Sequence, residues 1–179
     1  MNAPLPKHLL PDICQRETPA ALINALKTRF GERCSTALVV REQHGRDESS
    51  FAAPPPAAVV FAESTADVAD AVKLASQYEV PVIPFGVGTS LEGHLLAVQG
   101  GISIDVSRMN RVLSINAEDL TVTVQAGVTR KQLNEEVKST GLFPHRPGRR
   151  RDAWRHERDA RQRDQRRALW HHARKRAGA

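Results

Sequence analysis

The chain has 179 residues, with 26 Lys and Arg against 20 Asp and Glu and a formal net charge of +6. Its apolar content of 40% is ordinary for a globular chain, and no run approaches the roughly 18 apolar residues of a membrane-spanning helix. Residues 1–144 hold 13 basic and 16 acidic side chains, whereas residues 145–179 hold 13 and 4, so the basic character belongs to the last segment alone.

The N-terminal segment and the two cysteines bear on where the protein is located and on its redox state. The N-terminus has neither the basic start nor the apolar core of a secretory signal, so we expect a cytoplasmic protein. Cys14 and Cys34 are too few for a disulfide framework or a zinc site, and we interpret both as reduced, partly buried thiols. No metal site is expected.

The first half of the chain predicts few regular elements. Apolar residues recur at helical spacing over residues 19–30, and Gly31 follows where a helix commonly ends in a left-handed residue. Residues 40–49 are polar and have no clear period, so we expect a loop there. The three consecutive prolines at 54–56 indicate a boundary or a stiff connection.

A strand–helix–strand unit is predicted next, with parallel strands at 58–61 and 80–83. Ser64 and Asp67 form a capping-box pattern at the start of the helix, which ends near Tyr78. The expected inner face holds Val68, Ala71, Val72 and Ala75, and the expected outer face holds Asp67, Asp70 and Lys73. The later elements are a strand at 102–106 and a hairpin with strands at 112–115 and 120–124. A second capped helix follows, which begins with the pair Thr129 and Gln132 and ends at Gly141. Leu133 and Val137 are expected to face inward.

The most informative segment is a loop at residues 84–94, directly after the second strand. It carries three glycines and two hydroxyl side chains: Gly86, Gly88, Gly93, Thr89 and Ser90. Glycines let backbone N–H groups approach an anion closely, and hydroxyls add donors without bulk. This chemistry suits a pyrophosphate.

Two standard phosphate-binding loops fit the segment less well. A Walker loop needs Lys where His94 stands, which excludes it. A Rossmann fingerprint needs Gly where Leu91 stands, and no clear amphipathic helix begins afterwards. A Rossmann-type dinucleotide-binding oxidoreductase therefore remains as an alternative only.

Four strings in order carry a resemblance to a known family: VVREQHGRDES at 39–49, PFGVGTSLEGH at 84–94, VQGGISIDVSRMNRV at 98–112 and VQAGVTRKQLN at 124–134. They resemble the FAD-binding domain of the p-cresol methylhydroxylase type, and within it the FAD-linked D-lactate dehydrogenases and the flavin subunit of glycolate oxidase. The resemblance covers about residues 20–144. It implies an α+β fold, namely the N-terminal part of such a domain.

The resemblance also implies FAD as cofactor and a set of residues that hold it. The loop from Gly86 to Ser90 would wrap the FAD pyrophosphate, and Gly93 would close the turn. The full set is Pro84, Gly86, Val87, Gly88, Thr89, Ser90, Gly93, Met109, Gly127 and Val128. We interpret His94 as hydrogen-bonded within the loop rather than bonded to flavin, and His44 as a loop residue without a catalytic role.

The family pattern is lost between Pro144 and Arg149, so we divide the chain into an N-terminal extension (1–53), a partial FAD-binding domain (54–144) and an Arg-rich tail (145–179). One hypothesis for the tail is a frameshifted reading of a GC-rich gene, and sequencing the codons for 140–150 tests it. The alternative is a basic arm that attracts nucleic acid or an acidic partner. Residues 145–179 contain a single Leu and two Trp, so we expect this tail to be disordered or a polar helix. No specific nucleic-acid partner is expected.

The function indicated is that of an FAD-binding part of a flavin-dependent 2-hydroxyacid (D-lactate or glycolate) dehydrogenase. In such relatives a D-2-hydroxy acid is the substrate and its side-chain ligands lie further along the chain. We therefore assign no catalytic residue and expect this chain alone to be inactive. The rival class is a nucleic-acid-binding protein that uses the basic tail.

Overall fold

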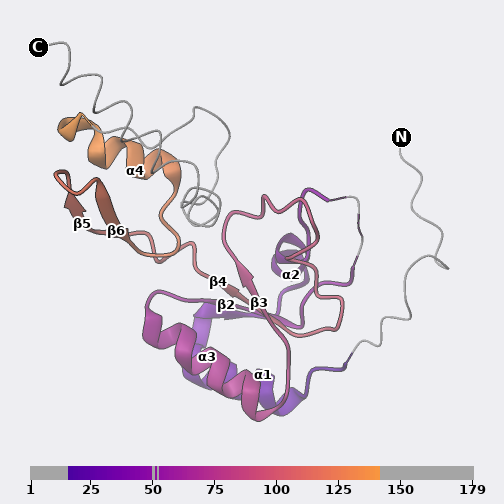
Figure 1. Cartoon of the computed structure of the whole chain (residues 1–179). Coiled ribbons are helices and arrows are strands. Elements are labelled where there is room, and N and C mark those ends of the chain that lie inside the picture. The colour runs from indigo at the N-terminus through magenta and orange to yellow at the C-terminus, as the bar shows by residue number, and fades with distance from the viewer. Residues whose placement is uncertain (1–15, 50, 52, 142–179) are drawn as a thin grey trace, which may run out of the picture. The chain divides into compact units, whose positions relative to one another are not determined.

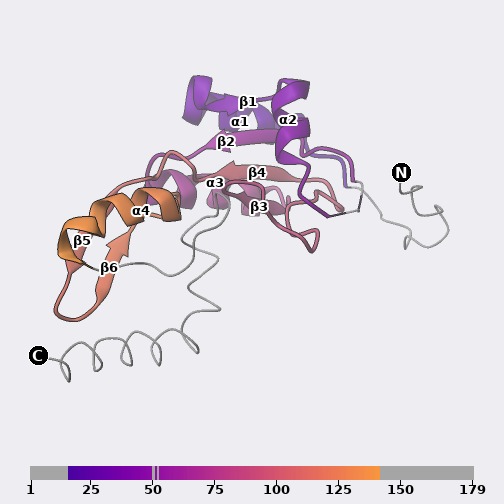
Figure 2. The same ribbon diagram turned by 90° about the horizontal axis from the view of Figure 1, so that it is seen from above.

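The computed structural model describes residues 16–49, 51 and 53–141. The chain divides after Met109 into two compact units. The first unit contains a four-stranded sheet in the order β1 (Cys34–Ser35), β2 (Ala58–Phe61), β4 (Ile102–Asp105) and β3 (Val82–Phe85), which Figure 2 shows side by side. Both β2 and β3 are parallel to β4, and β1 is antiparallel to β2. The predicted parallel strands thus exist, but β4 lies between them.

Helices cover both faces of this sheet (Figure 1). On one face lie α1 (Ala20–Phe30), which continues into the 3-10 turn η2 (Gly31–Arg33), and α3 (Thr65–Gln77). Alternate strand residues point into the core beneath these helices. This core contains Leu22, Leu26, Phe30, Cys34, Ala58, Val60, Ala62, Ala71, Ala75, Ile102, Ile104 and Met109. Helix α2 (Leu38–His44) covers the opposite face.

Several predicted elements of this unit are confirmed. Helix α1 ends at Gly31, whose φ is 56°. Helix α3 begins at Ser64, whose hydroxyl accepts a hydrogen bond from the Asp67 amide at 3.1 Å, and it ends before Tyr78. Strands β2 and β4 lie where the apolar runs predict them.

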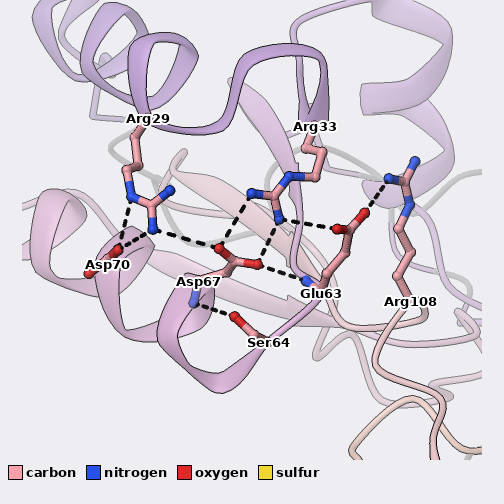
Figure 3. Close-up of polar contacts among 7 residues, drawn as sticks. All are labelled: Arg29, Arg33, Glu63, Ser64, Asp67, Asp70 and Arg108. Carbon is pink, nitrogen blue, oxygen red and sulfur yellow. Dashed lines mark hydrogen bonds and ion pairs between the residues drawn. The ribbon is translucent and has the colours of Figure 1, made fainter.

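The predicted outer face of α3 is wrong at Asp67, which is buried, and the predicted inner face is wrong at Val72, which is 43% exposed. Asp67 accepts hydrogen bonds from Arg33 Nη1 at 2.6 Å and from the Glu63 amide at 3.1 Å (Figure 3). Arg29 and Arg108 extend this network to Asp70 and Glu63 on the surface. The carboxylate is buried because a guanidinium from η2 meets it, which the helical period alone does not indicate.

The loop predicted at 40–49 is wrong over residues 40–44, which belong to α2, whereas residues 45–49 lie outside helices and strands as predicted. The helix has no apolar inner stripe: Leu38 and Val39 are 58% and 67% exposed, and its buried residue is His44. Arg41 secures it by donating from Nε to the Pro56 carbonyl at 2.6 Å. Tertiary polar contacts rather than amphipathic patterning hold this helix, so the hydrophobic period missed it.

Strand β3 begins and ends two residues later than predicted, because Pro84 was expected to begin the loop. Proline lacks the N–H that a central strand needs, but it is tolerated in an edge strand. Strand β3 is at the edge of the sheet, with β4 as its neighbour. Val80 is instead partly buried against the core, and its amide bonds to the Ala75 carbonyl at the end of α3.

The second unit has the predicted hairpin and helix. Strands β5 (Val112–Asn116) and β6 (Thr121–Val124) pair antiparallel, with a register shift between Val112 and Ser114. Helix α4 (Arg130–Val137) begins at Thr129, whose hydroxyl accepts from the Gln132 amide at 3.3 Å. Val137 is buried, Leu133 is half-buried, and the short turn η3 (Lys138–Thr140) ends at Gly141 in the left-handed conformation.

Some of the remaining expectations concern features outside the described residues, and others concern features within them. Cys14 and the tail at 145–179 lie outside them, so their interpretations stay predictions. Cys34 is a free, buried thiol whose pKa is raised by that burial, as the interpretation requires. Within the described part of the chain, the helices are too short or too polar to cross a bilayer.

The end of α3 offers a stabilising substitution. Glu79 follows the C-cap Tyr78 with a φ of 52°, a region in which a side chain is strained and glycine is common. We expect Glu79→Gly to raise the free energy of unfolding by about 0.5–1 kcal/mol. Denaturant unfolding measures this, with Gln77→Gly inside the helix as the control that should lower it by a similar amount. Equal destabilisation by both changes would contradict the expectation.

Candidate functional site

Three parallel strands end at one edge of the sheet in the first unit. Strand β2 ends at Phe61, β3 at Phe85 and β4 at Asp105, and these three residues are in register. The glycine-rich loop begins at Gly86, directly after β3. Open sheets of parallel strands bind ligands in crevices outside the carboxyl ends of their strands. The loop therefore lies where such a site is expected.

The loop's conformation depends on glycine. Gly88 has a φ of 73°, and a Cβ there would lie 3.2 Å from Cζ of Phe85. Gly93 also has a positive φ, of 76°. Residues 86–90 are all half-buried. The backbone is therefore folded tightly against the strand that precedes it while remaining partly accessible, as close approach to an anion requires.

Internal hydrogen bonds fix the second half of the loop. Ser90 Oγ lies 2.8 Å from His94 Nδ1, which confirms the interpretation of His94 as a residue bonded within the loop. The Ser90 carbonyl accepts from the Glu48 amide at 2.9 Å. The segment after α2 is thus in direct contact with the loop.

The Asp47 carboxylate lies beside this second half, near the Gly93 amide and the Ser90 hydroxyl. Its Oδ1 accepts from the Ser49 amide at 3.0 Å and from the Ser49 hydroxyl at 2.5 Å, while Oδ2 is buried and accepts no hydrogen bond from the described residues. Burial by itself would raise the pKa of Asp47. The Ser49 bonds, together with the nearby Gly93 amide and Ser90 hydroxyl, outweigh it and hold this pKa below its usual range.

The structure brings six of the ten predicted FAD residues together in the loop: Gly86, Val87, Gly88, Thr89, Ser90 and Gly93. Pro84 lies within β3 and is exposed. Met109 is 6% exposed and belongs to the hydrophobic core, so protein atoms surround its side chain. Gly127 and Val128 are buried in the second unit, between β6 and α4. The role of each in binding FAD stays a prediction.

Sequence reasoning missed two functional candidates, His44 and Asp105, which lie beneath the loop. Both are buried, and His44 Nε2 is 2.8 Å from Asp105 Oδ2. One signal was present in the sequence: Asp105 ends the apolar run of β4, and a carboxylate buried there needs a partner. The partner could not be identified because His44 was placed in a loop.

The loop fits an FAD pyrophosphate by its own chemistry. It combines backbone in the positive-φ region, two hydroxyl side chains and a position at the carboxyl edge of parallel strands. Among the described residues, no cluster of His, Cys, Asp and Glu is arranged to hold a metal ion.

Comparison with known families decides the family of the chain. The family model described as FAD binding domain matches residues 56–153, more than half of the sequence. The chain belongs to this FAD-binding domain family. The match begins at the buried Pro56 and extends past residue 144, where the resemblance seen in the sequence ends.

Curated relatives of this FAD-binding domain include hydroxyacid dehydrogenases. A probable mitochondrial D-lactate dehydrogenase of Danio rerio is 48% identical over 118 residues, which are 65% of this chain and 24% of the relative. The mitochondrial D-lactate dehydrogenase [cytochrome] of Arabidopsis thaliana is 40% identical over 136 residues, 74% of this chain and 24% of the relative. The glycolate oxidase subunit GlcD of Bacillus subtilis is 36% identical over 88 residues, which are 49% of this chain and 19% of the relative. The chain spans about a quarter or less of these relatives.

Solved structures agree on the fold. A 4-ethylphenol oxidase from Gulosibacter chungangensis has a TM-score of 0.63 and 28% identity, and the match covers 74% of this FAD-binding chain and 26% of the oxidase. A p-cresol methylhydroxylase has a TM-score of 0.61 and 18% identity over 69% of this chain and 25% of its own. The predicted fold class, the N-terminal part of an FAD-binding domain of the p-cresol methylhydroxylase type, is confirmed.

Proposed function

We propose that this chain provides the pyrophosphate-binding part of the FAD site in a flavin-dependent 2-hydroxyacid dehydrogenase, with D-lactate or glycolate as the class of substrate. The observation that carries the proposal is the half-buried loop at 86–90, whose glycine conformation follows a parallel strand in a member of an FAD-binding family. The named activities of the curated relatives support the substrate class.

In this proposal the chain's own residues bind and orient. Backbone amides of Gly86 to Thr89 face the pyrophosphate oxygens, because a turn with glycine at positive φ lets successive N–H groups converge on an anion. The bond between Ser90 and His94 holds the end of the turn in place. When bound, the flavin supplies a hydride acceptor for a hydroxyl-bearing carbon, and the protein's contribution is its orientation.

Equilibrium dialysis of the full chain against FAD and against riboflavin tests the proposal. Only FAD carries the pyrophosphate, so we expect it to bind at least about tenfold more tightly, the effect of losing one charge-assisted contact. Gly88→Val places a β-branched side chain at positive φ against Phe85 and should remove this preference.

The matched control is Gly31→Val, which also has a positive φ but has open space around it, far along the chain from the loop. It should keep the preference for FAD. Absence of FAD binding by the unchanged chain, or an equal preference in a folded Gly88→Val variant, would refute the proposal.

A further inference from the structure

The side chain of His44 has a hydrogen-bond partner at each ring nitrogen. Nδ1 lies 2.8 Å from the Val40 carbonyl oxygen, and Nε2 lies 2.8 Å from Asp105 Oδ2. The side chains of His44 and Asp105 are only 7% and 6% exposed. A carbonyl oxygen can only accept, so the ring donates from Nδ1. The pair is therefore fixed at both ends.

The imidazole ring also packs on the residue that begins the loop. Its centroid is 4.2 Å from that of Phe85 and 5.6 Å from that of Phe61, whose ring is nearly perpendicular to it. Phe85 in turn is the residue that a side chain at Gly88 would strike. Displacement of the His44 ring would therefore release Phe85 and, with it, the turn that Gly88 makes against Phe85.

The segment that follows His44 holds the other end of the loop. The Glu48 amide donates to the Ser90 carbonyl, and the Asp47 carboxylate lies near the Gly93 amide and the Ser90 hydroxyl. A Cβ placed on Gly93 would be 3.6 Å from the Phe51 ring. Residues 44–49 together with Phe51 thus contact both the start and the end of the loop.

We propose that His44 and Asp105 are a positioning pair that holds the glycine-rich loop in the conformation that receives the pyrophosphate. Asp105 is anchored to the sheet: its Oδ1 accepts from the Ser107 amide at 2.7 Å, and its backbone pairs with Phe61 and Phe85. His44 couples that anchor to Phe85, on which its ring packs, and to residues 45–49, which follow it in the chain. The pair also compensates a carboxylate that would otherwise lie unpaired at the edge where an anion binds. The ligand in this inference rests on the proposed function, but the control of loop conformation does not.

Hydrogen exchange of the loop amides tests the positioning role without any ligand. In His44→Phe the ring is kept and both hydrogen bonds are lost, so we expect amides of residues 86–93 to exchange at least about tenfold faster, as loss of a charge-assisted bond implies. Amides of β2 and β4 exchange through unfolding of the whole unit, so they should speed up only by the factor that the measured loss of stability sets, and by less than the loop amides. Ala75→Gly, in the core on the opposite face, is the control for general destabilisation. It should raise exchange throughout the unit instead.

Two further variants separate positioning from mere stability. Asp105→Asn keeps an acceptor for Ser107 and presents an N–H to the neutral Nε2 of His44, so it should preserve loop protection and bind FAD within about threefold of the unchanged chain. The double variant His44→Phe/Asp105→Leu removes the buried charge together with its partner. Its melting temperature should recover relative to His44→Phe, because paired replacement by apolar groups is nearly neutral. The loop should stay unprotected and FAD affinity should stay at least about tenfold weaker.

The results of these experiments distinguish failure of the positioning pair from failure of the proposed function. Unchanged loop exchange in His44→Phe, or loop protection that returns in the double variant together with stability, would overturn the inference. If the unchanged chain does not bind FAD while His44→Phe still releases the loop, the proposed function fails and the positioning pair remains. If FAD binds and His44→Phe alters neither affinity nor exchange, the positioning pair fails and the proposed function remains.

Discussion

We expect Gly101→Ala to be the most destabilising single substitution by one methyl group in this chain. Gly101 precedes β4, is buried and has a φ of 111°. A Cβ on Gly101 would overlap the carbonyl oxygen of Pro81, and that oxygen accepts the Ile102 amide that joins β4 to β3. The Gly101 carbonyl accepts from Ala57 at the start of β2. The methyl group would therefore separate strands on both sides of β4.

The expected cost is about 3–4 kcal/mol, from a strained backbone and an overpacked contact with backbone atoms that cannot move aside. Thermal unfolding of the full chain should show a midpoint lower by more than about 10 °C. Gly31→Ala is the matched control, since its φ of 56° brings strain but nothing lies within 4 Å of the added carbon. It should cost only about 1 kcal/mol. Similar losses in the two variants would show that overlap with Pro81 is not the cause.

Local patterns predicted the elements whose stability is local. The caps at Ser64 and Thr129 are read from residues three positions apart, and the structure has both. Strand β4 alternates Ile102 and Ile104 with Ser103 and Asp105, and all four residues are buried, as expected for a central parallel strand. The glycine-rich loop was also located correctly, because its composition is unusual for a surface turn.

Elements held by distant partners could not be predicted in this way. Helix α2 exposes Leu38 and Val39 and buries His44, an inversion that has no cause within residues 38–44. Its cause is Asp105, 61 residues away. Asp67 is buried for the same kind of reason, because its partner Arg33 belongs to an earlier turn. A charged residue on a helix is normally assigned to solvent, so an ion pair between elements reverses the assignment.

The candidate site also has one part that local sequence predicts and one part that depends on distant partners. The part that we propose faces the ligand is a contiguous stretch, residues 86–93, and its composition marks it in the sequence. The supporting part consists of His44, Asp105, residues 47–49 and Phe51, which only folding brings against the loop. Supporting contacts leave little trace in a single sequence, because each residue is unremarkable until its partner is known.

Asp67→Ala should have the second-largest effect, a loss of about 2–4 kcal/mol in the free energy of unfolding. The change leaves the Arg33 guanidinium and the Glu63 amide without the carboxylate that accepts from both. The methyl side chain keeps the backbone amide that Ser64 caps, so the start of α3 is retained. Denaturant unfolding at neutral pH measures the loss.

Asp70→Ala, three positions after Asp67 on the same helix, is the matched control. Asp70 accepts from Arg29 at 2.7 Å, but both side chains are more than one-third exposed. An exposed ion pair contributes at most about 1 kcal/mol. A loss for Asp70→Ala as large as that for Asp67→Ala would show that burial of the Asp67 carboxylate does not determine the effect.

The effect of Asp67 should also depend on pH. The hydrogen bond from Arg33 lowers the pKa of Asp67, burial opposes it, and the Glu63 amide lowers it further. The native state therefore binds this proton less readily than the unfolded state. Its contribution is fully present above the unfolded value of about 3.9 and is lost as the pH falls through the lower native value. We expect the difference in unfolding free energy between the unchanged chain and Asp67→Ala to be constant from neutral pH to about pH 5 and to shrink below about pH 4. Parallel curves for the unchanged chain and Asp67→Ala down to acid pH would contradict a native carboxylate held ionised by Arg33.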